Sequence, residues 1–292
     1  MKTLTVITTT FNRGYCINQV YESLLKQKCK DFVWLVIDDG STDNTREIIE
    51  KYIQDDIIEI DYRYKSNGGM HTARNLAYSC VQTEINVIID SDDWLAENSV
   101  ELIIHFWKEN KDEHCAGFIT QNTDPSGRII GTDFPKGLIR CSYRDFFEKY
   151  EMHGDKKIIL RSDLAKRYPF PEYENEKFYP ASYKYYMLGQ EYDFLICNAI
   201  TCIVDYNSTS MTRDKYAQYR TCPRSFMHYR KTMINLGFGF KQDSKNMMHY
   251  VMEQSYAREK ADREIIRNPL YYFCYLPGKL LFMYLNMTRR KY

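Results

Sequence analysis

An apolar run that ends in three acids is the feature that most constrains the fold of this chain. Residues Val87–Ile89 are all β-branched, and Asp90–Asp93 directly after them contains three carboxylates. A short apolar run with polar borders predicts a buried parallel strand. Ligands of open α/β sheets bind beyond the carboxyl ends of the strands, so these acids are expected beside a ligand. Closely spaced carboxylates repel one another unless a cation lies among them, and their oxygens suit Mg²⁺ or Mn²⁺.

A plainer interpretation of the same acids stays open. Asp92 or Asp93 could stand near the N-terminus of the next helix, as part of a solvated acidic turn that caps it.

The plan of strand, polar turn and helix repeats along the first part of the chain. The expected strands are 4–10, 32–37, 57–64 and 87–89, and the helical patterns between them include residues 17–25, 45–52 and 74–77. Alternation of strands and helices with short loops predicts an α/β fold, a doubly wound and mainly parallel sheet similar to a Rossmann fold. Right-handed crossovers bring the carboxyl ends of such strands to one edge of the sheet.

Polar and small residues follow each of these strands, and a nucleotide fits such an edge. Asp39 can accept a hydrogen bond from a base or a ribose, Gly68 lets the backbone approach a phosphate, and Arg74 can reach a phosphate or hold the acids. The alternatives are an N-cap role for Asp39 and a plain tight turn at Gly68-Gly69. Neither GxGxxG nor GxxxxGK[ST] occurs, which argues against a dinucleotide dehydrogenase or a P-loop NTPase.

Four motifs in order resemble the family 2 inverting glycosyltransferases with the GT-A fold. They are Thr-Thr-Phe-Asn-Arg, Asp-Asp-Gly-Ser-Thr-Asp, Asn-Gly-Gly…Ala-Arg-Asn and Asp-Ser-Asp-Asp, and the resemblance covers roughly residues 3–125. It implies a nucleoside diphosphate sugar as donor, with a uracil or ribose contact from Asp39 and a DXD motif at Asp90-Ser91-Asp92. The nucleotide-sugar residues that it implies are Thr9, Phe11, Asn12, Asp39, Asn67, Gly68, Arg74, Asp90 and Ser91. Asp92 and Asp93 are the implied ligands of Mn²⁺ or Mg²⁺.

The middle of the chain is expected to recognise the acceptor. Residues 169–178 resemble the F-P-x-x-x-G-E-K-F stretch of some bacterial members, with Asn175 in place of the glycine. The resemblance implies Glu176 as the catalytic base, which takes a proton from the attacking hydroxyl group. Glu172 and Glu174 are rivals for this role, and a solvated acidic loop is the structural alternative. Asp155, in a segment that resembles the same members, is a further candidate for contact with the donor sugar or the acceptor, as is Glu174.

The end of the chain differs from the rest in charge. Residues 213–292 contain 16 Lys and Arg against 6 Asp and Glu, a net charge of +10, which leaves −9 for residues 1–212. The expected division is a catalytic domain at 1–212, with a nucleotide-sugar half at 1–125 and an acceptor half at 126–212, and a basic, aromatic, helical region at 213–292. The tyrosine-rich stretch 179–206 is expected to contribute mainly to the core.

Residues 270–285 are almost wholly apolar and aromatic, and Arg289-Arg290-Lys291 follows soon after. The stretch is too short, and too interrupted by Pro277-Gly278-Lys279, to span a bilayer. Aromatic residues beside a basic cluster predict an interfacial element on an anionic membrane. The alternatives are a hairpin packed on the catalytic domain and a contact in a homodimer. A polar loop at 207–214 is expected to close over the donor.

Nine scattered cysteines without CxxC spacing indicate free thiols in a reducing compartment, and the N-terminus lacks a signal-peptide pattern. The expected location is the cytoplasm, either free or peripheral on the inner face of the cell membrane.

The leading hypothesis is a metal-dependent inverting glycosyltransferase. It moves a sugar from a nucleoside diphosphate donor, with UDP as the favoured nucleotide, to a hydroxyl of a cell-surface glycan or a lipid-linked acceptor. The alternatives are a sugar nucleotidyltransferase and a non-catalytic protein that binds a membrane or nucleic acid. The negative charge of residues 1–212 and the four polar strand ends argue against a nucleic-acid partner.

Overall fold

The structure, a computed structural model, describes residues 2–205 and 215–288. The chain forms two compact units, which are described separately. The first consists of Met1–Phe170 and Ser182–Ser208, and the second of Pro171–Ala181 and Thr209–Tyr292. The segment Pro171–Ala181, expected in the catalytic domain, therefore groups with the C-terminal helices.

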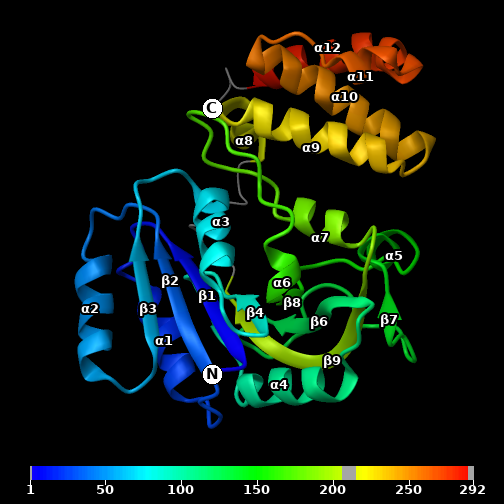
Figure 1. The fold of residues 1–292 in the computed structure, drawn as a ribbon. Helices are drawn as coiled ribbons and strands as arrows, with labels where there is room; N and C mark the ends of the chain where they lie inside the picture. The colour runs from blue at the N-terminus through cyan, green and yellow to red at the C-terminus, as the bar shows by residue number, and fades with distance from the viewer. Residues whose placement is uncertain (1, 206–214, 289–292) are drawn as a thin grey trace. The chain divides into compact units, whose positions relative to one another are not determined.

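The first unit is built on a nine-stranded sheet (Figure 1). Its strands are β1 (Leu4–Thr10), β2 (Phe32–Asp38), β3 (Ile60–Tyr64), β4 (Ile85–Ile88), β5 (Asp93–Leu95), β6 (Cys115–Thr123), β7 (Arg140–Cys141), β8 (Lys157–Arg161) and β9 (Asp193–Val204). Their order is β3-β2-β1-β4-β8-β6-β9-β5, and β7 pairs with β9. The first four strands are mutually parallel, whereas β8 is antiparallel to both of its neighbours.

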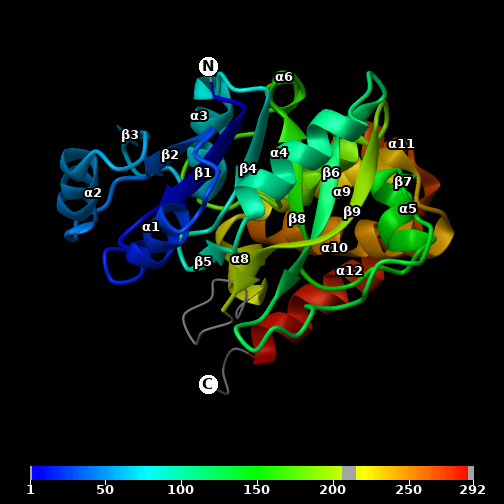
Figure 2. The same ribbon diagram turned by 90° about the horizontal axis from the view of Figure 1, so that it is seen from below.

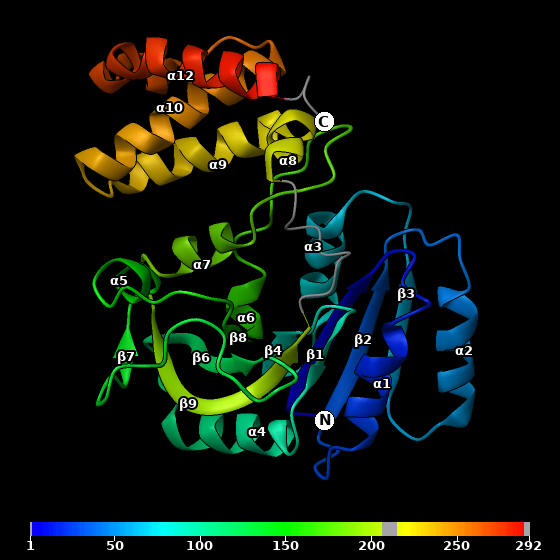
Figure 3. The ribbon, with the colours of Figure 1, turned by 180° about the vertical axis from the view of Figure 1, so that it is seen from behind.

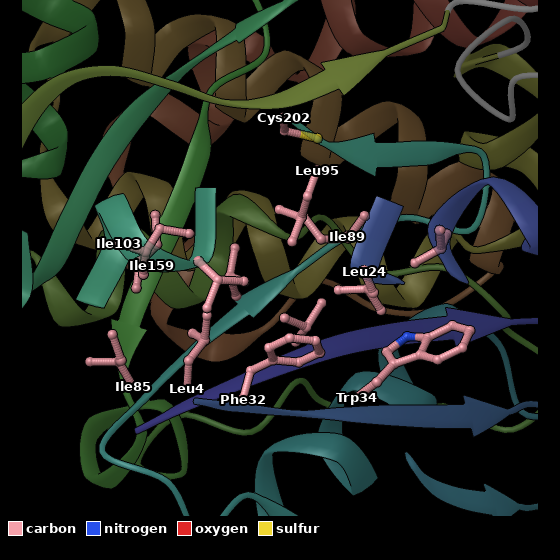
Figure 4. Close-up of a cluster of buried hydrophobic side chains, with 14 of the residues drawn as sticks. Leu4, Leu24, Phe32, Trp34, Ile85, Ile89, Leu95, Ile103, Ile159 and Cys202 are labelled. Atoms are coloured by element: carbon pink, nitrogen blue, oxygen red, sulfur yellow. The ribbon is translucent and has the colours of Figure 1, made fainter. Parts of the chain in front are cut away.

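Helices cover both faces of this sheet. They are α1 (Ile17–Leu25), α2 (Thr45–Asp55), α3 (Met70–Cys80), α4 (Ser99–Asn110), α5 (Tyr143–Glu148), α6 (Ser162–Ala165) and α7 (Ser182–Leu188). On one face, α1, α2 and α4 contribute to a core with side chains of β1, β2 and β4, in which Leu24 and Ile103 meet Leu4, Trp34 and Ile85 (Figure 4). The helix α4 also packs against β9 (Figure 2), and α3 covers the opposite face over β1 and β2 (Figures 1 and 3).

The strand register brings the polar turns to one edge, as the sequence predicts. Thr10 lies beside Asp38, and Asp38 beside Tyr64, while Ile7 pairs with Ile88. The residues that follow β1, β2, β3 and β4 therefore share the carboxyl edge of the parallel half of the sheet. We call this the strand-end edge.

Asp93 does not cap a helix, because it begins the short strand β5, and α4 starts only at Ser99 after an N-cap at Asn98. The structure thus contradicts the interpretation of Asp92 and Asp93 as a helix-capping turn. The long strand β9 begins at Asp193 and ends at Val204.

The second unit is helical, as expected for the C-terminal region. Its helices are α8 (Lys215–Thr221), α9 (Pro223–Leu236), α10 (Phe240–Ala257), α11 (Arg263–Arg267) and α12 (Pro269–Thr288). The helix α10 lies between α9 and α12 (Figures 1 and 3). Its Met247, Tyr250 and Val251 form a core with residues of the other helices, Tyr271 and Cys274 of α12 among them.

The expected break at Pro277-Gly278-Lys279 is absent, because α12 continues through Pro277. Gly278 is a point of tight approach between α12 and α10. A Cβ atom at this position would lie 2.6 Å from Cβ of Val251 and 2.7 Å from the carbonyl oxygen of Met248. Gly278 therefore permits a close helix contact. No helix in the described part of the chain has the length and apolar character that a membrane span requires.

Candidate functional site

Asp39, the residue directly after β2, links this strand end to the loop that follows β3 through hydrogen bonds. Its side chain is 4% exposed, and its carboxylate accepts hydrogen bonds from the backbone N–H groups of Gly68 (3.0 Å) and Gly69 (2.7 Å). Lys65 Nζ donates to it at 2.7 Å, and Asn67 Nδ2 at 3.2 Å. The Asn67–Gly69 turn thus wraps around one carboxylate, and Asp39 has no part in capping α2.

The glycine beside this carboxylate is required by geometry. Gly40 has a φ of +86°, and a Cβ there would lie 2.7 Å from the backbone N of Asn67. A residue with a side chain would be strained and would push the Asn67–Gly69 turn away. The Asp-Asp-Gly sequence after β2 therefore lets two strand-end loops touch.

Asn12 connects the loop after β1 to the loop after β2. Its Oδ1 accepts from the backbone N–H of Thr42 (2.8 Å) and of Asp43 (3.3 Å), and its own N–H donates to Ser41 Oγ at 2.8 Å. Asn12 has a φ of +53°, a left-handed conformation that asparagine tolerates better than most residues. Nearby, Phe11 is 45% exposed, and Thr9 is half-buried.

Each of the three acids that follow β4 in the chain pairs with a cationic side chain from another part of the first unit. Arg74 Nη2 donates to Asp90 Oδ1 at 3.0 Å. Lys157 Nζ lies 3.4 Å from Asp93 Oδ2, and Arg13 Nη1 lies 3.6 Å from Asp92 Oδ2. Of the two roles open to Arg74, tying down the acids is the one that the structure displays. No sequence pattern pointed to Lys157, which reaches the acids because β8 pairs with β4.

The three acids differ in access to solvent. The side chains of Asp90 and Asp92 are 44% and 28% exposed, whereas that of Asp93 is 6% exposed. Desolvation and the neighbouring acids Asp90 and Asp92 raise the pKa of Asp93 to about 7, although Lys157 opposes the shift. For Asp90, desolvation acts upward too, but Arg74 and Lys157 outweigh it and lower the pKa. Asp90 therefore stays ionised, while Asp93 takes up a proton more readily than Asp90 does.

In the described ranges, no three His, Cys, Asp or Glu side chains are grouped closely enough to hold a metal ion by themselves. Asp90 and Asp92 nevertheless present partly exposed carboxylates at the strand-end edge, two positions apart in the sequence. Mg²⁺ is usually held by one or two carboxylates together with substrate phosphates, and this donor set fits that requirement. Asp93 fits it poorly, because its carboxylate is buried beside Lys157.

Asp155 stands in the loop before β8 and is exposed. The surrounding protein nevertheless partly desolvates the Asp155 carboxyl group and raises its pKa, with a further rise from the charge of Asp90 and an opposing effect from Lys157. Two glycines fix this loop: a Cβ at Gly154 would lie 2.6 Å from the Cα of Gly131. Asp155 therefore interacts electrostatically with Asp90, one of the acids that follow β4. Its place in the sequence did not reveal this interaction.

Glu174 and Glu176 belong to the second unit. Glu174 is exposed. Glu176 is 6% exposed, and its two carboxylate oxygens accept the backbone N–H groups of Arg224 (2.9 Å) and Ser225 (2.7 Å) at the start of α9. Asn175 has a φ of +66°, which explains why asparagine can replace the glycine of the resembling motif.

The loop at 207–214 and the cluster Arg289-Arg290-Lys291 lie outside the described residues. Of the tyrosines in 179–206, Tyr179 is buried and bonds through its hydroxyl to Nδ1 of His228. Tyr185 interacts electrostatically with Arg74, Asp90 and Asp155, and burial raises its pKa.

Comparison with known proteins identifies related sequences. The model of the family "Glycosyl transferase family 2" matches residues 5–167. Glycosyltransferase GlyG of Streptococcus pneumoniae is 28% identical over 136 residues, 45% of this chain and 45% of GlyG. Chondroitin synthase of Pasteurella multocida is 31% identical over 124 residues, 42% of this chain and 13% of the synthase. This chain spans less than half the length of these relatives.

Solved glycosyltransferase structures share the fold. Residues 1–349 of S. aureus TarS, in complex with UDP-GlcNAc, superpose with a TM-score of 0.60 at 18% identity, over 95% of this chain and 79% of TarS 1–349. Mannosyltransferase PcManGT from Pyrobaculum calidifontis, in complex with GDP-Man and Mn²⁺, gives 0.56 at 14% identity, over 97% of this chain and 84% of PcManGT. At such low identity, these similarities establish the fold alone, which is of the GT-A type.

Proposed function

The chain belongs to glycosyl transferase family 2, and we propose that this glycosyltransferase moves a sugar, with inversion, from a UDP-sugar to a hydroxyl group of a cell-surface glycan or a lipid-linked acceptor. The observation that carries the proposal is the strand-end edge, where Asn12, Asp39 and the acids Asp90 and Asp92 share one side of the sheet. Membership in this family also sets aside the sugar nucleotidyltransferase alternative.

The nucleoside is proposed to bind over the loops after β1 and β2. Thr9, Phe11 and Asn12 form one wall, and Phe11 offers an exposed ring for contact with a base. Asp39 contacts the uracil or the ribose in this proposal, and the sugar donor then replaces some of the hydrogen bonds that Asp39 now accepts from Asn67 and Gly68. UDP binding in TarS and GDP-mannose binding in PcManGT are properties of those proteins that support a nucleotide-sugar donor here.

The diphosphate is proposed to lie beside Asp90-Ser91-Asp92, the DXD motif of this chain. Asp90 and Asp92 would hold Mn²⁺ or Mg²⁺ together with the phosphates, and the ion would neutralise charge on the leaving diphosphate. Arg74 keeps the carboxylate of Asp90 ionised and oriented through the 3.0 Å hydrogen bond. Lys157 holds Asp93 back from the edge, so Asp93 supports the site rather than contacting the donor.

Glu176 is proposed as the base that takes the proton of the acceptor hydroxyl. The two N–H groups of α9 use one lone pair on each carboxylate oxygen and leave others available, since a carboxylate offers about four. Capping α9 therefore fixes the orientation of the Glu176 carboxylate and leaves lone pairs that can accept a proton. Glu174 and Asp155 are proposed to contact the acceptor or the donor sugar, because both are exposed.

Calorimetric titration of UDP into the purified chain, with and without Mn²⁺, tests the proposal directly. We expect saturable binding that Mn²⁺ strengthens, and loss of the Mn²⁺ effect in the variant Asp92→Ala. A suitable control is Glu97→Ala, which removes an exposed carboxylate from the turn before α4. Absence of binding by UDP and by other nucleoside diphosphates, under both conditions, would contradict the proposed donor class.

A further inference from the structure

The helix α12 has one buried face and one exposed face, and both are largely apolar. Tyr271, Cys274, Gly278 and Leu285 are buried against the rest of the second unit. The other face consists of large apolar side chains that are more than half exposed. They are Tyr272, Phe273, Leu276, Leu280, Met283, Tyr284 and Met287, with exposed fractions between 54% and 69%. We call these seven residues the outer stripe.

The outer stripe is continuous. At about 3.6 residues per turn, its members fall within an arc of about 120° and extend over roughly 22 Å of helix. Phe240, at the start of α10, is 72% exposed and lies beside Phe273, with ring centroids 6.2 Å apart. Exposed apolar residues of the first unit, such as Ile53, Ile139 and Ile200, stand instead on separate segments of the chain. Scattered residues of that kind are ordinary, whereas a contiguous apolar patch indicates a binding surface.

The charge within α12 has one sign. The sequence of α12 contains a single charged residue, Lys279, and no acid. Lys241 follows Phe240, Arg267 precedes α12, and both are exposed. The sequence continues after α12 with Arg289, Arg290 and Lys291.

We propose that the outer stripe docks the protein on an anionic lipid membrane. The helix would lie in the plane of the interface, with Leu276, Leu280 and Met283 among the acyl chains. Tyr272 and Tyr284 have an apolar ring and a polar hydroxyl, which suits the headgroup level. The buried face of α12 is committed to α10, so the helix can present only one side to lipid.

A second copy of the chain is the main competing occupant of this surface. A two-fold interface would bring the same patch onto itself and would set its basic flanks against each other. An anionic membrane complements those flanks instead. This inference is independent of the donor and the chemistry proposed above.

Flotation of the full chain with lipid vesicles tests the inference. We expect strong binding to vesicles that contain phosphatidylglycerol, weaker binding to phosphatidylcholine alone, and weakening by salt. The combined substitution Leu276→Ser, Leu280→Ser and Met283→Ser should lower partitioning by about tenfold or more. The matched control Ile53→Ser, Ile57→Ser and Ile139→Ser removes three exposed aliphatic side chains from the first unit and should leave flotation unchanged.

Three results would overturn the inference. One is failure of the wild-type chain to float with anionic vesicles at low salt, and another is equal flotation of the stripe variant and the wild type. The third is a concentration-dependent dimer in sedimentation velocity that the stripe variant dissociates, without flotation, which would assign the outer stripe to a second copy. UDP titration of the same samples keeps this outcome separate from the donor proposal, because the stripe variant should bind UDP normally.

Discussion

The strand-end edge of the first unit and the outer stripe of the second differ in how their energetically unfavourable side chains are compensated. At the edge, each of Asp90, Asp92 and Asp93 faces a cation of the same unit. On α12, seven large apolar side chains have no comparable cover. Carboxylates crowded together raise the energy of the fold itself, so the fold must compensate them. Exposed apolar groups are tolerated until a second surface removes them from water. The edge therefore compensates its unfavourable groups within the fold, whereas the outer stripe leaves its apolar groups in contact with water.

Removal of Asp92 should have the largest effect and affect only the first region. Asp92→Ala is expected to lower sugar transfer by about 10³-fold, because the charge that develops on the leaving group loses its stabilisation. Radiolabelled transfer from a UDP-sugar measures this. Full activity of the variant, or of the wild type in EDTA, would contradict the metal assignment. Thermal unfolding should change little, since the ion pair of Asp92 with Arg13 is long and partly exposed.

Removal of the proposed base should separate catalysis from binding. Glu176→Gln is expected to lower turnover by about 10²-fold or more while UDP affinity stays near normal. Glu97→Gln is the matched control, because it makes the same change at an exposed position outside the proposed site. If Glu174→Gln is the inactive variant, the base lies elsewhere in the loop. If Glu176→Gln only lowers the melting temperature, Glu176 serves solely as the cap of α9.

The two faces of α12 should respond differently to substitution. Gly278→Val is expected to destabilise the second unit by about 2 kcal/mol, because the new side chain collides with Val251 and the backbone of Met248. Leu276→Ala on the outer stripe should change stability by less than about 0.5 kcal/mol, since it removes an exposed side chain. Urea unfolding followed by circular dichroism measures both. A large loss in Leu276→Ala would mean that the outer stripe packs against protein in solution.

The second unit also contains a buried acid, and it should give a pH signature. Glu253 is fully buried, with Arg230 Nε at 3.5 Å, and burial raises its pKa to about 8. In the folded state it therefore holds a proton that the unfolded chain, with an ordinary pKa of about 4.5, has released. The free energy of unfolding should thus fall as pH rises from about 4.5 to 8.

Glu253→Gln should remove this part of the pH dependence. Urea unfolding of the variant and the wild type across this range provides the comparison. Equal slopes would mean that Glu253 is ionised in the folded state, balanced by Arg230.

The sequence by itself determined the local elements of the strand-end edge. The β-branched runs predicted β1, β2 and β4, and the polar residues after them predicted which side chains gather at their ends. These inferences work because the period of a strand and the chemistry of a turn depend on neighbouring residues. The match of the family to residues 5–167 confirms the resemblance recognised from the four motifs.

Only the tertiary structure decided which groups pair with the side chains of the site. Lys157 reaches Asp93 because β8 inserts beside β4, and Glu176 meets α9 across 48 positions of sequence. The character of α12 was equally out of reach, because its composition is apolar on both sides. Its Gly278 face is covered by α10 and its outer stripe is not, and which side of a helix is covered depends on where another helix packs. Local pattern fixes what a segment becomes, whereas partners far along the chain fix which of its groups remain available.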